Sequence, residues 1–356
     1  MNRSRWIATA VVPAAIAAGA LTWSLQPGAA ADLPAKTPEE VLAMALDSDV
    51  RAYSGALEQS SQLGLPELPD TGPAAGLASA LDLVTGTHTA RVFVDGPANV
   101  RLQVLDRLAE RDVVRRNRDV WLYNSRDNTA AHVTLPVRSP SGNRLPEDFG
   151  TPDGMQTPDQ LAHRLLAAVE PSTQVTVGED AEVAGRTAYE LVLDPLSTDT
   201  LVDSVSVAVD SQTGLPLSIK VQARGQQQPA FSLAFTELRL QAPAQELFEF
   251  TPPPGAKVQE HTLQVPSTRH EQGDTGHLRH GPDSKPTVSG EAWDAVVELP
   301  AGSVPADSQL LDQLTYPVSG GRALSTALLT VLFTDDGRVF AGSVPLGRLQ
   351  AAAGER

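Results

Sequence analysis

Apolar and polar residues alternate along the chain between residues 201 and 258, and this alternation predicts a series of antiparallel strands. Turn residues separate three runs, with Asp210 to Gly214 after the first and Gly225 after the second. A period of two with glycine-bearing turns is typical of hairpins that expose one face to water. The apolar positions of the three runs are Val205, Val207 and Val209, then Leu217, Ile219 and Val221, then Phe231, Leu233 and Phe235.

Further strands are predicted on both sides of these runs. Phe248 to Phe250 is expected to form a last strand that stops at the prolines of residues 252–254, because proline cannot donate to a sheet ladder. The three runs and the earlier strands together make roughly ten or eleven. The earlier predicted strands cover residues 51–62, 87–94, 100–105, 108–114, 120–124, 130–135, 174–182 and 186–194.

Two helices are predicted from their first residues. Thr37 can cap a helix that starts at Pro38, and Glu40 stands in the capping-box position. Thr157 and Pro158 repeat this start, with Gln160 three residues after the threonine, and the second helix ends before Pro171. Because the strands form one continuous meander, both helices are expected to pack on one face of one sheet.

The pattern divides the chain into four parts. Residues 1–31 are predicted to be an export signal peptide, with a basic start, an apolar stretch and a small-residue cleavage site. An uncleaved N-terminal anchor is the alternative, because the apolar stretch approaches the ~20 residues that span a bilayer. Residues 32–260 are the main domain, residues 261–286 a polar linker, and residues 287–356 a small C-terminal α+β module.

The C-terminal module is expected to hold a few short elements. Residues 292–299 are predicted to form a strand, and residues 307–314 and 346–353 to be helical. Residues 324–334 are predicted to pair with residues 338–344 through a hairpin turn. The module is short enough that it is expected to dock on the main sheet rather than to fold alone.

Charge and cysteine content exclude several function classes. The formal net charge is −16, which argues against a nucleic-acid partner held through phosphate contacts. The chain has no cysteine, so it has no disulfide framework, no thiolate metal site, no cysteine nucleophile and no lipid-modified N-terminal cysteine.

Four histidines suggest a metal-binding site, but their spacing argues against one. His261, His270, His277 and His280 lie with Asp274 in the predicted linker, and their spacing fits no zinc pattern, so a solvated linker is favoured. No metal and no cofactor is predicted.

No catalytic motif is present either. The chain contains no G-x-S-x-G elbow, no H-E-x-x-H and no glycine-rich phosphate loop. Asp194 with Asp199, or Asp203 with Asp210, could be paired carboxylates, but exposed strand carboxylates are far commoner. The chain is therefore predicted not to be an enzyme.

The order of several motifs resembles the LolA-like lipoprotein-carrier family. Residues 207–216 read V-x-V-D-x-x-T-G-L-P, residues 233–238 read L-x-F-T-x-L, and residues 248–256 read F-x-F-x-P-P-x-G-A. Residues 119–123 are similar to a D-G-x-x-L/V-W-x-Y segment of the family, without its glycine. The chain is most similar to a secreted actinobacterial branch, which also resembles the sensor domain of RseB/MucB-type sigma-factor regulators.

The resemblance implies a fold and a cavity. The implied fold class is α+β, mainly β, with a large antiparallel sheet curled into an unclosed half-barrel and helices on its concave face. Such a cavity could hold an acyl chain, because each buried CH₂ group contributes roughly 0.8 kcal/mol. The sequence leaves open which face of the sheet is concave. An error of one position in assigning residues to faces would move every candidate ligand-binding residue to the opposite face. The candidate ligand-binding residues are Phe93, Leu102, Val104, Trp121, Leu191, Leu193, Ile219, Phe231, Leu233 and Phe235.

The implied function is that of an extracytoplasmic binding protein. It would carry or chaperone an acyl chain, a lipid or a lipoprotein, either secreted or held at the outer face of the cytoplasmic membrane. The alternative is an RseB-like regulator in envelope-stress signalling, with an anti-sigma factor or a membrane transporter component as partner. One departure bears on the choice: Gly96-Pro97 stands where the carriers have a gating arginine before the proline, although Arg101 matches the arginine that follows.

Overall fold

The computed structural model describes residues 33–65, 86–105, 109–135, 157–167, 172–262, 286–303 and 313–354. The predicted signal segment, most of the predicted linker, and the histidines at 270, 277 and 280 with Asp274 lie outside the described residues. None of the helices within the described ranges is long and apolar enough to cross a membrane.

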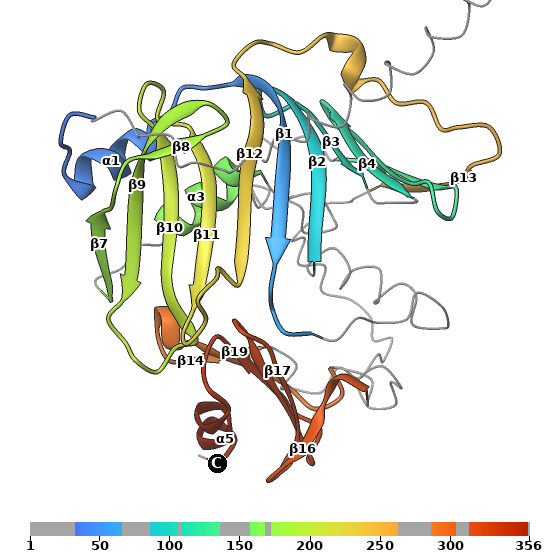
Figure 1. Cartoon of the computed structure of the whole chain (residues 1–356). Helices are drawn as coiled ribbons and strands as arrows, with labels where there is room; N and C mark the ends of the chain where they lie inside the picture. Colours follow the sequence, from blue (N-terminus) through green and yellow to red (C-terminus); the bar gives the residue numbers. More distant parts are fainter. Residues whose placement is uncertain are drawn as a thin grey trace, which may run out of the picture.

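Thirteen strands form one large sheet that does not close on itself, with β13 at one edge and β7 at the other (Figure 1). The strand order is β13-β6-β5-β4-β3-β2-β1-β12-β11-β10-β9-β7, and β8 also pairs with β9. Figure 1 shows that β3, β4 and β13 lie at a steep angle to the strands between β7 and β12, so the sheet is strongly curved. The strands are β1 (Ala52–Ser61), β2 (Gly86–Asp95), β3 (Asn99–Leu105), β4 (Glu110–Arg116), β5 (Asp119–Asn124), β6 (Thr129–Thr134), β7 (Thr173–Val177), β8 (Ala181–Val183), β9 (Arg186–Pro195), β10 (Val202–Asp210), β11 (Pro216–Ala223), β12 (Phe231–Arg239) and β13 (Lys257–Thr262).

Both predicted helices are present and pack on the same face of this sheet. They are α1 (Pro38–Leu46) and α3 (Pro158–Ala167). Val41 and Ala45 of α1, with Ala162 and Leu166 of α3, share one buried cluster with apolar residues of β9, β10 and β11. We call this side of the sheet the helix face and the other side the outer face. The mainly β class and the unclosed sheet are thus confirmed.

The last strand of the main sheet differs from the predicted one. Residues 248–250 do not form a strand: Phe248 ends a short 3-10 helix, η1 (Gln245–Phe248), and is 1% exposed. The chain then passes the prolines and forms β13, which pairs in parallel with β6, with Lys257 opposite Thr129. The sheet is therefore mixed rather than purely antiparallel. No local hairpin signal marks a parallel pair, because its two strands need a long connection.

A second, six-stranded sheet follows, in the order β14-β15-β19-β18-β17-β16. Its core consists of Val296, Leu332, Phe340, Val344 and Leu349. Its elements are β14 (Thr287–Ser289), η2 (Ala292–Asp294), β15 (Val296–Leu299), β16 (Tyr316–Val318), β17 (Gly321–Ser325), β18 (Thr330–Thr334), β19 (Val339–Gly342) and α5 (Leu346–Gly354).

The elements predicted for residues 287–356 agree only in part with the structure. The run 292–299 begins as η2 and only then becomes β15, and the run 324–334 is broken into the end of β17 and β18. The hairpin between β18 and β19 is present, and Gly337 in its turn has φ +85°. Most of the predicted helix at 307–314 lies outside the described residues.

The second sheet packs against the end of the main sheet (Figure 1). The backbone N–H of Leu201 and the hydroxyl of Thr200 both donate to the carbonyl of Ser343, at 2.7 and 2.9 Å. The indole N–H of Trp293 donates to the hydroxyl of Thr173 at 2.8 Å, and its ring packs against the cluster under α1 and α3. The two sheets are thus joined by hydrogen bonds and by two apolar side chains, Trp293 and Leu328, which pack against this cluster.

Candidate ligand-binding face

The strand register decides which candidate residues share a face, because residues directly opposite each other on paired strands point to the same side. Leu191 lies opposite Val207, which in turn lies opposite Ile219, and Ile219 lies opposite Leu233. Val207 and Ile219 pack in the cluster with α1 and α3. This row of residues therefore lies on the helix face.

The helix face continues across the middle of the sheet. Phe235 lies opposite Leu57, Leu57 opposite Ala90, and Ala90 opposite Val104. Every candidate except two lies on this face: Leu102, Val104, Leu191, Leu193, Ile219, Phe231, Leu233 and Phe235.

Phe93 and Trp121 lie on the outer face, so the expectation that they belong to the same inward set is wrong. Phe93 pairs with Ser54 and with Arg101, and Trp121 pairs with His132. Trp121 stacks on His132 with ring centroids 4.3 Å apart and contacts Phe250, which crosses the outer face. Both strands carry apolar residues on both faces, so alternation alone could not choose between neighbours such as Val92 and Phe93.

The helix face is covered to different degrees along its length. Leu191 and Leu193 are fully buried and Ile219 is 1% exposed, in contact with the cluster that α1 and α3 complete. Phe231 is half-buried and packs against a second cluster that contains Leu233 and Phe235. Further towards β13, Val100, Val120 and Leu122 of the same face are half-buried. A ligand beside Leu191 would have to displace the helices, whereas the half-buried positions already offer apolar surface.

One polar contact ties α3 to the sheet within this apolar layer. The hydroxyl of Tyr53 donates to Asp159 Oδ1 in the first turn of α3, at 2.8 Å. Tyr53 is 2% exposed, and its ring meets Phe235 edge-on with centroids 5.8 Å apart. Burial, and then the negative charge of Asp159, raise the pKa of Tyr53 well above its usual value. The sequence analysis missed this pair, although the four-residue spacing of Tyr53 and Leu57 in one strand puts both on one face.

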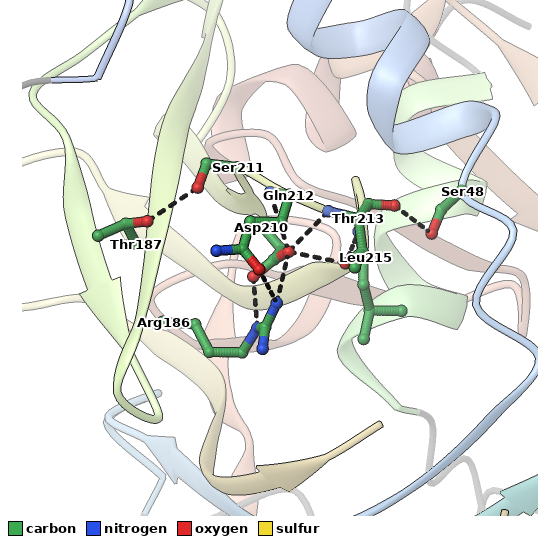
Figure 2. Close-up of polar contacts among 8 residues, drawn as sticks. All are labelled: Ser48, Arg186, Thr187, Asp210, Ser211, Gln212, Thr213 and Leu215. Carbon is green, nitrogen blue, oxygen red and sulfur yellow. Dashed lines mark hydrogen bonds and ion pairs between the residues drawn. The ribbon is translucent and has the colours of Figure 1, made fainter. Parts of the chain in front are cut away.

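The V-x-V-D-x-x-T-G-L-P motif has a structural role, which Figure 2 shows. Asp210, whose side chain is 1% exposed, accepts from Arg186 at 2.5 and 3.0 Å and from the backbone N–H and hydroxyl of Thr213 at 2.8 and 2.7 Å. The hydroxyl of Ser48, just after α1, donates to the carbonyl of Thr213 at 3.0 Å. Burial would raise the pKa of Asp210, but the hydrogen bonds from Arg186 and Thr213 outweigh it and lower the pKa. The motif thus holds α1 against the sheet.

The outer face carries its own polar contacts. Arg101 binds Asp112 at 2.6 and 3.1 Å and donates to the carbonyl of Leu247 at 3.1 Å, which anchors η1. Burial raises the pKa of Asp112 despite the neighbouring guanidinium of Arg101. Arg101 therefore has a structural partner on the face opposite to the helices.

The described residues contain no group of three or more His, Asp or Glu side chains that could hold a metal ion. From β9 to β3 the helix face offers aliphatic and aromatic side chains, and Arg111 and Arg115 of β4 add charge beyond them, since they lie opposite Val104 and Val100. Its chemistry is therefore suited to an apolar ligand.

Comparisons with known proteins give similarity at the level of structure. No protein-family model matches this chain, and no curated protein matches it. The structure of Pseudomonas aeruginosa MucB in complex with MucA is similar, with a TM-score of 0.40 and 17% identity over 88% of this chain and 95% of that chain. A LolA superfamily protein from Nitrosomonas europaea has a TM-score of 0.23 and 13% identity, covering 61% and 99%. A putative outer membrane lipoprotein-sorting protein domain from Vibrio parahaemolyticus has a TM-score of 0.25 and 13% identity, covering 59% and 95%. The identities to these three structures lie between 13% and 17%.

Proposed function

We propose that this protein is a non-catalytic extracytoplasmic binding protein that holds an acyl chain, free or as part of a lipid or lipoprotein, against the helix face. The observation that carries the proposal is the continuous apolar surface of that face from β9 to β3, with the helices packed mainly on its β9–β12 half. Removing an acyl chain from water at such a surface stabilises the complex by up to about 10 kcal/mol before entropy costs. The helices would then act as a partial cover.

A matched pair of substitutions tests this proposal, because Phe231 and Phe93 are both half-buried but lie on opposite faces. With a fluorescent fatty acid as the probe, Phe231→Ala should weaken binding by about tenfold, whereas Phe93→Ala should leave it unchanged. Native mass spectrometry of protein purified from its own envelope without detergent should show an extra mass that extracts as an acylated molecule. Failure of the wild-type protein to bind the fatty acid, together with an empty mass spectrum, would rule out the proposal.

A second candidate function is supported by the docked second sheet. We propose, as the alternative, an RseB-like regulator that binds an anti-sigma factor in envelope-stress signalling. The hydrogen bonds at Thr200, Leu201 and Thr173 give the two sheets a defined contact that a partner protein could loosen or reinforce. Pull-down of the tagged full-length protein from envelope extracts should recover a membrane-anchored anti-sigma protein. Recovery of acylated proteins alone would favour the carrier role.

A further inference from the structure

A pocket of about 350 Å³ opens on the outer face, on the side of the sheet away from the proposed acyl site. It is lined by Ser54, Gly55 and Ala56 of β1, Arg91 and Phe93 of β2, and Glu237 and Arg239 of β12. The register explains the hollow: Ala56 lies between Arg91 and Glu237, and Ser54 lies between Phe93 and Arg239. Small side chains on the middle strand form the floor, and long side chains on the flanking strands form the walls.

Gly55 is required where the β1–β12 ladder changes register at the floor of this pocket. The register shifts between Ala56 and Leu57, and a Cβ on Gly55 would lie 2.3 Å from the carbonyl oxygen of Glu237. Bulges of this kind bend a strand and re-aim its side chains. The three wall residues Arg91, Glu237 and Arg239 are exposed to solvent.

The two arginines are unpaired. Within the described parts of the chain, neither Arg91 nor Arg239 makes an ion pair or a side-chain hydrogen bond, and Glu237 has no side-chain partner either. The neighbouring Arg101 differs, because Asp112 and the carbonyl of Leu247 occupy its donors. Two free guanidinium groups on one pocket are unexpected in a chain with a net charge of −16.

We propose that this pocket binds a small zwitterionic group whose phosphate or carboxylate lies between Arg91 and Arg239 and whose ammonium group faces Glu237. Guanidinium groups bind such oxyanions through paired, charge-assisted hydrogen bonds. A purely anionic ligand would meet the carboxylate of Glu237 at like charge, whereas a zwitterion complements all three charges. Phe93 and the small residues of β1 supply apolar surface for the link between the two charged ends. The group could be a free metabolite or the headgroup of a lipid.

Calorimetric titration of the full-length protein tests the site. O-phosphoethanolamine should bind more tightly than inorganic phosphate and far more tightly than ethanolamine. Arg91→Gln with Arg239→Gln should lower its affinity at least about tenfold, and Glu237→Gln should reduce its advantage over phosphate. Binding to vesicles that contain phosphatidylethanolamine, with no binding of the free compound, would identify the lipid headgroup as the source. Absence of binding to either probe would overturn the proposal.

Two controls separate the site from general effects. Arg51→Gln with Arg126→Gln removes the same charge from exposed positions outside the pocket and should leave binding unchanged. Ser54→Leu fills the floor without changing any charge and should abolish binding, while the thermal unfolding of each variant reports that it is folded. Equal binding by the wild-type protein and the Arg91/Arg239 double variant would contradict the site. None of these substitutions should change fatty-acid binding, because the helix face lies on the other side of the sheet.

Discussion

At the scale of single residues, Asp210 connects segments that are far apart in the sequence. Its carboxylate joins Arg186 on β9 to Thr213 in the following turn, and Ser48 and Met44 at the end of α1 contact that turn. The carboxylate is buried, whereas Arg186 remains partly exposed. Removal of the negative charge would break the ion pair with Arg186 and weaken the hydrogen bonds from Thr213.

Asp210→Asn should lower the free energy of unfolding by about 2 kcal/mol, because the ion pair with Arg186 is lost and the hydrogen bonds from Thr213 lose their charged acceptor. The folded pKa of Asp210 lies below its unfolded value of about 3.9, so its contribution is complete above that pH and is lost as the pH falls through the folded pKa. Urea unfolding from pH 7 to pH 2.5 should therefore show the wild-type advantage shrinking below about pH 4. The exposed pair of Arg224 and Asp203 is the control, since Asp203→Asn should change stability by at most about 0.5 kcal/mol.

Gly214 offers a second residue-scale prediction. Its φ is +71°, and a Cβ there would lie 2.1 Å from the carbonyl oxygen of Met44. Gly214→Ala should destabilise the protein by more than about 2 kcal/mol and increase hydrogen exchange in α1. Gly185→Ala is the matched control, because Gly185 has φ +72° with nothing within 4 Å of the added Cβ, so only the strain of about 1 kcal/mol remains. Equal effects of the two substitutions would mean that the approach to Met44 is unimportant.

At the scale of elements, the two helices are attached differently. In α1 the predicted capping box is complete: the Thr37 N–H donates to Glu40 at 2.8 Å, and the Glu40 N–H donates to Thr37 at 3.3 Å. In α3 the N–H of Thr157 donates to Gln160 at 3.3 Å, and the bond from Tyr53 to Asp159 adds an anchor from the sheet. The retention of α3 on the helix face therefore depends in part on one hydroxyl from β1.

Tyr53→Phe should loosen α3 without emptying the core, because the ring and its contact with Phe235 are kept. We expect a loss of about 1–2 kcal/mol and faster hydrogen exchange in residues 158–167 than in β1. If the helices cover the proposed acyl site, Tyr53→Phe should also increase the rate at which a fatty acid binds. Tyr123→Phe is the control, since it removes a hydroxyl that donates to Asn128 on the outer face at 3.2 Å, away from α3. Unchanged exchange in α3 would show that the Tyr53 bond does not hold it.

At the scale of the whole molecule, the second sheet packs against one end of the main sheet through a small set of contacts. Trp293 and Leu328 supply the apolar part of this contact, and Ser343 and Thr173 accept the hydrogen bonds. The backbone N–H of Ala327 also donates to the carbonyl of Leu63, at 2.9 Å. Such a contact can be weakened while the core of each sheet is left intact.

Trp293→Ala should uncouple the two sheets, at a cost of about 3 kcal/mol, and should turn one thermal transition into two. Trp293→Phe keeps most of the packing and loses the hydrogen bond, so about 1 kcal/mol is expected. Differential scanning calorimetry distinguishes the two variants. A single, equally shifted transition for both would show that the ring contact does not couple the sheets.

Much of this fold could be predicted from local chemistry. Threonine before proline marked both helix starts, and alternation with glycine turns marked the hairpins around residues 201–239, because these signals act between residues close in sequence. The strand at 257–262 could not be predicted, since its partner β6 lies far back in the chain and parallel pairing leaves no turn signal.

The sequence by itself therefore determined both helix starts, the hairpins around residues 201–239 and the mainly β class. Only the tertiary structure decided which face each residue takes, so that Phe93 and Trp121 lie opposite to Phe231 and Leu233. The same holds for the bond between Tyr53 and Asp159, and for the pocket between Arg91 and Arg239. Strand register and long-range pairing bring these groups together, and neither is encoded in the spacing of neighbouring residues.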